Sequence, residues 1–364
     1  MVNERNRALD AIKVIATVII VFHHYQQVFN VFFENRINYF GGWFYFGFLV
    51  ELFFCISGFL MARYVPKIAA GALRFPDFFF RRYLRIIPVM AISVVSTSVL
   101  LVIHEGVIGM RYMDTIPSVW GTIIASLGIQ AGWGFENPTI NNPIWYVSIL
   151  LFCYIAFYFI SWLSGRHRVS PVYGFALMVF LGVGVWEADS SLPFLTYGMC
   201  RGYYAFFWGV LLCMILDRPA IRAKINVLAA VSLGVLAYLT WLLANHRPEA
   251  EWNLRFTMTF VYYSALIILA QAPLVRRLFG WRIVELLGRI SFNAYVWHGG
   301  MYTLLIILAH ALKLNIDYGR HFVMYGFAAG CFVVGTLSYY LLERPINRGI
   351  DALRRRRSIP QREG

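Results

Sequence analysis

A lysine and a histidine stand eleven residues apart in the first apolar run of the chain, LDAIKVIATVIIVFHHYQQVFNVFF at residues 9–33. In an α-helix, eleven steps of about 100° return nearly to the starting direction, so Lys13 and His24 would share one face, about 16 Å apart along the axis. Ionisable groups inside a membrane are costly and usually face the interior of a helix bundle, where they mark a functional path. The alternative is that Lys13 snorkels to one membrane surface while His24 merely reaches the other.

A carboxylate follows in the second apolar run, FYFGFLVELFFCISGFLMARY at residues 44–64. Counted from the ends that face the same side, Glu51 and His24 lie at similar depth. A carboxylate beside an imidazole selects its tautomer and stabilises the imidazolium, which a general base requires. The sequence therefore predicts that Glu51 orients His24, with a buried pair of purely structural role as the alternative. Ser57 and Gly58 are interpreted as helix-packing residues, not as a nucleophile site.

Three arginines stand close together in RFPDFFFRRYLRIIP at residues 74–88, a stretch expected to lie along the cytoplasmic interface ahead of Pro88 and the third helix. Arg81, Arg82 and Arg85 are spaced so that their guanidinium groups can converge on one anion. Guanidinium groups bind phosphate through two parallel hydrogen bonds, so a nucleotide with several phosphates would suit them. Lipid headgroups are the alternative ligand.

Further polar and aromatic candidates lie in two later segments. GWGFENPTINNPIWY at residues 132–146 is the longest outer connection, and its Trp145 and Tyr146 suit either a sugar-facing surface or an aromatic belt. In ELLGRISFNAYVWHGGMY at residues 285–302, His298 falls near the middle of the membrane. We assign Trp145, Tyr146 and His298 to a substrate-facing set, with an interhelical hydrogen bond as the alternative role of His298.

The amino-acid composition indicates the class of protein that contains these residues. Of the 364 residues, 60% are hydrophobic and only 14% are charged, which excludes a soluble globular protein. The net charge of +14 does not indicate nucleic-acid binding, because the basic residues lie between apolar runs and act as topology signals. The five cysteines lack metal-site spacing, so we expect small buried residues and no metal.

The apolar runs predict an all-α, polytopic integral membrane protein with about ten transmembrane helices. The expected segments are 9–33, 44–64, 84–104, 143–164, 171–187, 199–217, 224–244, 252–270, 288–311 and 321–343. Alternate connections carry most of the Lys and Arg residues, and the positive-inside rule places them, with both termini, in the cytoplasm. We expect one domain over residues 1–364, ending in a basic tail at about 346–364 that anchors topology or contacts membrane lipids.

Taken in order, these runs resemble the membrane-bound acyltransferase-3 family, which includes bacterial O-acetyltransferases of lipopolysaccharide, peptidoglycan and exopolysaccharide. The motifs that carry the resemblance are LDAIKVIATVIIVFHH, VELFFCISGFLMAR, FFFRRYLRIIP, IWYVS, RISFNAYVWH and LLERP. Each is weak alone, but six in the right order cover nearly the whole chain. Two positions depart from the family pattern, because Lys13 stands where Arg is more common and Leu150 where many members have Glu.

The resemblance implies a ten-helix enzyme of the bacterial inner (cytoplasmic) membrane that passes an acetyl group from cytoplasmic acetyl-CoA to a glycan or glycolipid hydroxyl. It maps the essential histidine of the family to His24, its basic partner to Lys13, and its arginine loop for coenzyme A to Arg81, Arg82 and Arg85. Leu150 suggests a different subgroup, which weakens any transfer of acceptor specificity.

We therefore expect an O-acyltransferase in which His24, oriented by Glu51, is the general base. Burial favours the neutral imidazole that accepts a proton. Direct attack on the thioester and a transient acyl-histidine both remain open. The rival hypotheses are a membrane transporter, since ionisable residues also line transport paths, and a non-catalytic partner in glycan export. A homo-oligomer stays open, as do the acceptor and the acyl length.

Overall fold

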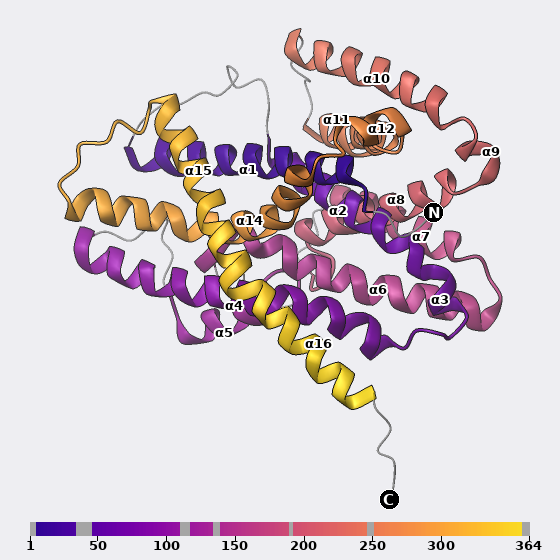
Figure 1. The fold of residues 1–364 in the computed structure, drawn as a ribbon, viewed down its shortest axis with the longest axis horizontal. Coiled ribbons are helices and arrows are strands. Elements are labelled where there is room, and N and C mark those ends of the chain that lie inside the picture. The colour runs from indigo at the N-terminus through magenta and orange to yellow at the C-terminus, as the bar shows by residue number, and fades with distance from the viewer. Residues whose placement is uncertain are drawn as a thin grey trace, which may run out of the picture.

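The computed structural model describes residues 5–33, 46–109, 117–133, 139–188, 192–245 and 251–358. Within these ranges every regular element is helical, and the elements pack into one bundle (Figure 1). Residues 134–138 of the outer connection and residues 359–364 of the expected basic tail lie outside the described residues.

The long helices run through most of the chain and are joined by short helical turns. The α-helices are α1 (Arg7–Phe33), α2 (Leu49–Met61), α3 (Val65–Ala69), α4 (Phe75–Ile108), α5 (Val119–Leu127), α6 (Trp145–His167), α7 (Pro171–Ala188), α8 (Tyr197–Leu216), α9 (Pro219–Arg222), α10 (Ile225–Asn245), α11 (Glu251–Phe256), α12 (Tyr263–Leu269), α13 (Pro273–Leu278), α14 (Arg282–Ala311), α15 (His321–Ser338) and α16 (Arg344–Ser358). Tighter or wider turns link them at η2 (Phe46–Phe48), η3 (Ala62–Tyr64), η4 (Thr139–Ile144), η5 (Thr257–Tyr262) and η6 (Tyr339–Glu343).

Each of the ten expected apolar segments overlaps a helix or an unbroken run of helical turns. Seven helical stretches of the described chain are long and apolar enough to cross a membrane, and two shorter apolar helices cover residues 171–185 and 254–269. The prediction of an all-helical polytopic membrane protein is therefore confirmed.

The basic aromatic stretch at residues 74–88 differs from its prediction. It does not form a separate interfacial segment but makes up the first turns of α4, which continues through Pro88 to Ile108. A proline inside a helix removes one hydrogen-bond donor and crowds the preceding turn, yet the helix persists where neighbouring helices pack against it. The arginines of this stretch are therefore held on a rigid helix.

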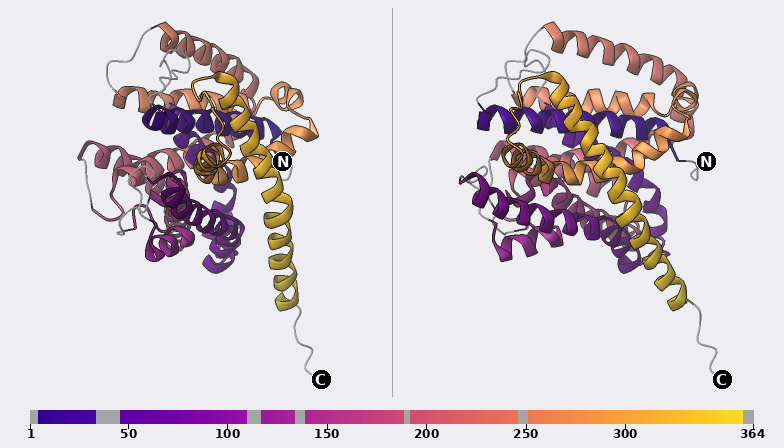
Figure 2. Two further views of the ribbon diagram at one scale, coloured as in Figure 1. Left: turned by 90° about the vertical axis from the view of Figure 1, so that its left-hand side faces the viewer. Right: turned by 60° about the vertical axis from the view of Figure 1, so that its left-hand side comes forward.

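Helix α14 occupies a central place in the bundle. It packs against α1, α4 and α15, and Figures 1 and 2 show α1 and α14 side by side. Helix α15 crosses the bundle obliquely, and α16 continues it beyond the other helices. Arginines near the starts of α1, α14 and α16, together with Arg85 of α4, line adjoining cavities at one end of the bundle.

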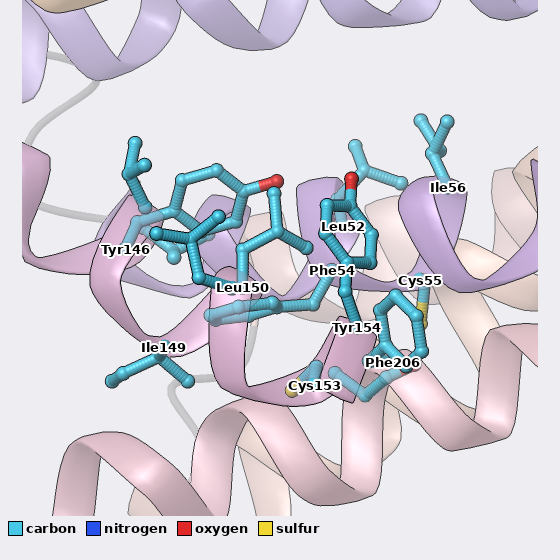
Figure 3. Packing of buried hydrophobic residues seen from close by; sticks show 14 of the residues in the cluster. Leu52, Phe54, Cys55, Ile56, Tyr146, Ile149, Leu150, Cys153, Tyr154 and Phe206 are labelled. Atoms are coloured by element: carbon cyan, nitrogen blue, oxygen red, sulfur yellow. The ribbon is translucent and has the colours of Figure 1, made fainter. Parts of the chain in front are cut away.

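A second group of helices forms the apolar core. Phe54 of α2, Tyr146 and Cys153 of α6 and Phe206 of α8 interlock in this core, and Figure 3 shows them pointing toward one another. Leu150, at the position where many family members have Glu, is buried in the same cluster. An apolar residue is what this packing requires at position 150.

Glycines set the close approach of α2 and α8. A Cβ atom on Gly58 would lie 1.9 Å from the backbone oxygen of Phe206, and one on Gly209 would lie 2.0 Å from the backbone oxygen of Cys55. Small residues at such crossings let membrane helices touch through their backbones. The interpretation of Gly58 as a packing residue is confirmed.

We therefore expect Gly58→Ala to lower the free energy of unfolding by about 1–3 kcal/mol, the usual cost of forcing extra atoms into a packed interior. Thermal unfolding of the purified protein in detergent measures the change. Gly234→Ala in α10 is the matched control, since a Cβ there meets nothing within 4 Å. Equal stability of the two variants would contradict the close approach.

Candidate active site

Two histidines from distant parts of the chain meet in the interior of the bundle. Nδ1 of His24 in α1 lies 2.9 Å from Nε2 of His298 in α14, and the two rings stack with centroids 5.0 Å apart. His298 is completely buried, and His24 is partly buried. The expected polar position at mid-membrane in α14 therefore contacts the histidine of the first helix directly.

The hydrogen bonds of His298 determine where the protons lie when both rings are neutral. Nδ1 of His298 is hydrogen-bonded to the backbone oxygen of Tyr295, which can only accept, so Nδ1 carries the proton. Nε2 of His298 is then an acceptor, and Nδ1 of His24 must donate to it. This leaves the lone pair of His24 on Nε2, an atom for which the structure describes no hydrogen-bond partner. His24 is thus set up as a proton acceptor.

The turn before α6 braces the part of α14 that carries His298. Nδ2 of Asn141 donates to Oγ of Ser93 and to the backbone oxygen of Val296, each at 3.1 Å. The hydroxyl of Tyr295 donates to the backbone oxygen of Pro143. These bonds hold α14 in the turn just before His298, so they also help to fix the geometry of the histidine pair.

Among the described residues, the structure gives Glu51 partners other than His24. The carboxylate of Glu51 accepts hydrogen bonds from Arg201 at 2.7 and 2.8 Å, from Arg255 at 2.9 Å and from the hydroxyl of Tyr204 at 2.9 Å. His298, assigned to the substrate-facing set, takes the place beside His24 instead. The contacts described for Glu51 thus come from Arg201 and Tyr204 of α8 and from Arg255 of α11, and not from the imidazole on α1.

The cluster around Glu51 is a buried ion group with one excess positive charge. Glu51 is 0% exposed, Arg255 1% and Arg201 9%. The guanidinium of Arg201 also lies 4.8 Å from the ring centroid of Trp145, and its charge acts on His23. Trp145 of the substrate-facing set therefore packs against this cluster, whereas Tyr146 is buried and lies 3.2 Å from Oγ of Ser57.

Arg201 and Arg255 were not among the residues predicted for the site. A glutamate inside an apolar helix needs a cation from the protein, because an uncompensated charge there costs several kcal/mol. The sequence therefore indicates that Glu51 needs a cation, but it does not indicate which arginine supplies it. Helices α8 and α11 enclose both arginines, so neither lies in an outer connection.

Lys13 has a partner on its own helix. Its Nζ lies 2.6 Å from Oδ1 of Asp10, and the same carboxylate is bonded to Arg5. Asp10 is 2% exposed and packs against Gly288 of α14, where a Cβ would lie 2.6 Å from the Cβ of Asp10. Lys13 is thereby held at the start of α1, on the same continuous helix as His24.

The three arginines of α4 do not share one role. Arg82 is folded back onto the protein, with its guanidinium 3.8 Å from the centroid of Phe78 and 4.4 Å from that of Tyr64. Arg81 is exposed. Arg85 lines a cavity at this end of the bundle, and its charge acts on Lys13. The structure therefore separates the arginines that were expected to converge on one anion.

Breaking the Glu51 cluster should destabilise the protein. Glu51→Gln leaves two buried guanidinium groups facing a neutral amide, a change that costs about 3–5 kcal/mol when one partner of a buried ion group is removed. Thermal unfolding in detergent, compared with wild type, measures it. Asp317→Asn is the control, since it breaks an exposed ion pair with Arg320 that is worth at most about 1 kcal/mol. Unchanged stability with lost turnover would instead favour a direct role of Glu51 in chemistry.

Known proteins resemble this chain over nearly its whole length. The model of the acyltransferase-3 family, described as an acyltransferase domain, matches residues 6–343. YrhL of Bacillus subtilis strain 168, named as a candidate peptidoglycan O-acetyltransferase, is 21% identical over 345 residues, which cover 84% of this chain and 51% of that protein. The peptidoglycan O-acetyltransferase OatA of Listeria monocytogenes is 21% identical over 378 aligned positions, covering 94% of this chain and 56% of its own.

The chain spans about half the length of these curated relatives, and no solved structure matches it. The family match includes the helices that carry His24 and His298, the Glu51 cluster and the arginines of α4. With a match of this extent, the chain belongs to the acyltransferase-3 family.

Proposed function

We propose that this protein is an integral membrane O-acyltransferase that moves an acetyl group from cytoplasmic acetyl-CoA to a hydroxyl of a cell-surface glycan or glycolipid. The observation that carries the proposal is the hydrogen-bonded pair of histidines, which leaves Nε2 of His24 as a proton acceptor inside an acyltransferase domain. Acyl transfer to an alcohol needs such an acceptor, because the hydroxyl must lose its proton as it attacks.

In this mechanism Nε2 of His24 accepts the proton of the acceptor hydroxyl while the hydroxyl oxygen attacks the thioester carbonyl. The carbon–sulfur bond then breaks, and the imidazolium of His24 returns the proton to the departing sulfur. An ester and coenzyme A result. His298 stabilises the imidazolium through its Nε2, which accepts a hydrogen bond from Nδ1 of His24. His298 is thus a positioning residue, in the role expected of Glu51.

The proposed topology has ten membrane spans in a bacterial inner membrane, with both termini in the cytoplasm. It is supported by the convergence of the basic starts of α1, α4, α14 and α16 at one end of the bundle, as the positive-inside rule requires. Lys13 lies between that end and His24. The acyl donor would therefore enter past Lys13, and the acceptor would meet His24 from the opposite side.

The acceptor is proposed as a glycan because the two relatives are named for peptidoglycan O-acetylation. Trp145, half-buried beside Arg201, offers an aromatic face on which a sugar ring could stack. The position of the acylated hydroxyl is left open by these contacts.

A transporter is the second candidate, and one observation favours it. Paired histidines in a membrane interior also relay protons in transporters. Specific, saturable binding of acetyl-CoA by the purified protein, with release of coenzyme A in the presence of acceptor, separates the enzyme from the transporter and from a non-catalytic export partner.

Substitution of the histidines tests the proposal. His24→Ala should reduce transfer of labelled acetyl from acetyl-CoA into a membrane glycan extract by about 10²–10⁴-fold, the usual contribution of a general base. His298→Ala should lower kcat while KM changes little, because His298 acts on the imidazolium. His298→Gln should recover part of the rate, since its amide oxygen can accept from Nδ1 of His24.

Thermal unfolding of each variant provides the control for folding. Acetyl transfer at the wild-type rate by a folded His24→Ala protein would contradict the proposed role of His24. Equal rates for His298→Ala and wild type would leave His24 as the base and remove His298 from the mechanism.

A further inference from the structure

A two-lobed cavity opens at the basic end of the bundle, between α1, α4, α14 and the junction of η6 with α16. The first lobe has a volume of about 380 Å³ and is lined by Arg7, Arg282 and Tyr340 among others. The second has a volume of about 240 Å³ and is lined by Arg5, Arg85 and Arg348 among others. Arg289, Tyr339 and Arg344 line both lobes, so the two adjoin. A volume of this order suits a small-molecule ligand.

The charge of the cavity is strongly positive. Seven arginines line its two lobes against three carboxylates, those of Glu285, Glu343 and Asp351. Two of the arginines are paired with Glu285, since Arg7 lies at 3.0 Å and Arg289 at 2.6 Å. In the described part of the chain, no carboxylate lies within ion-pair distance of Arg85, Arg282, Arg344 or Arg348. These four guanidinium groups are therefore available to bind an anion from outside the protein.

Phosphate is the anion that fits this arrangement. Guanidinium groups bind phosphate oxygens through paired hydrogen bonds, and arginines from four different elements surround the space. A ligand with a single phosphate would satisfy one lobe only. Coenzyme A carries a 3′-phosphate on its ribose and a separate pyrophosphate, about four negative charges in all near pH 7. The net charge of the lining residues is of the same size and opposite sign.

The surroundings of the second lobe indicate how a ligand bound in the cavity would be oriented. Glu343, in this lobe, accepts a hydrogen bond from Asn293 of α14, in the bundle interior. Arg5, which also lines this lobe, shares the carboxylate of Asp10 with Lys13. Of the two lobes, the second is therefore the one linked to Lys13. The first lobe presents Tyr340, which is 41% exposed and offers a flat surface to a base.

We propose that this cavity binds the phosphates of coenzyme A, with the 3′-phosphate in the first lobe against Arg282 and the pyrophosphate between Arg344 and Arg85. The inference rests on the proposed function for its ligand. Most of the phosphate contacts would then come from α14 and α16 and not from Arg81 and Arg82 of α4, because Arg82 is folded onto Phe78 and Tyr64. The start of α16 is then part of the donor site.

The test compares coenzyme A with 3′-dephospho-coenzyme A, which lacks only the 3′-phosphate. Binding of each is measured by calorimetry to the full-length protein in nanodiscs of phosphatidylcholine. Arg282→Gln should lower the affinity for coenzyme A by about 10- to 100-fold, which corresponds to the loss of one or two charge-assisted hydrogen bonds. The affinity for the dephospho form should not change. Arg344→Gln should lower the affinities for both ligands by similar factors. Arg218→Gln, an exposed arginine remote from the cavity, is the control and should change neither.

A second set of nanodiscs containing phosphatidylglycerol distinguishes a nucleotide phosphate from a lipid headgroup. If the variants bind coenzyme A as wild type does but retain less phosphatidylglycerol on purification, the cavity is a lipid site and the inference is overturned. If wild type binds coenzyme A and every arginine variant binds it equally well, the phosphates lie elsewhere and the proposed function stands. If wild type does not bind coenzyme A, both the inference and the proposed donor fail together.

Discussion

Polar side chains buried among membrane helices have no water to bind, so each must find its partner within the protein. Glu51 meets Arg201 and Arg255, and His24 meets His298, and in both groups the partners come from helices far apart in the chain. Each contact therefore ties two or three helices together at a defined height and rotation. The arrangement of the bundle and the geometry of the histidine pair follow from the same requirement.

Helix α14 shows how this requirement concentrates function on one element. Three side chains within two turns bind three different neighbours, because Asn293 binds Glu343 near α16, Tyr295 binds Pro143 before α6, and His298 binds His24 of α1. A helix held in this way cannot rotate without breaking several buried bonds at once. The rigidity that positions His298 is also what places Arg289, one turn before Asn293, beside the basic cavity.

The proposed donor cavity and the histidine pair lie along the length of one helix, α1. The basic cavity, Lys13 and His24 follow one another from the start of α1 toward its end, and α1 is an unbroken helix over this length. Positive charge is concentrated at one end, where a phosphate-bearing donor can be recognised. The interior holds the imidazole of His24, whose Nε2 is placed to take a proton. A thioester carried on a long flexible arm is suited to bridge two such sites, because its charged part and its reactive part are well separated.

By itself the sequence determined the family, the positions of the apolar helices, the candidacy of His24 and Lys13 and the clustering of arginine at one end, because hydropathy, charge and motif order are properties of the chain. It also indicated that Glu51 must be compensated. Only the tertiary structure decided the partners: Arg201 for Glu51, His298 for His24, and an aromatic cradle for Arg82. Helical periodicity gives the depth and face of a residue within its own helix, but which other helix lies against that face depends on packing between segments hundreds of residues apart.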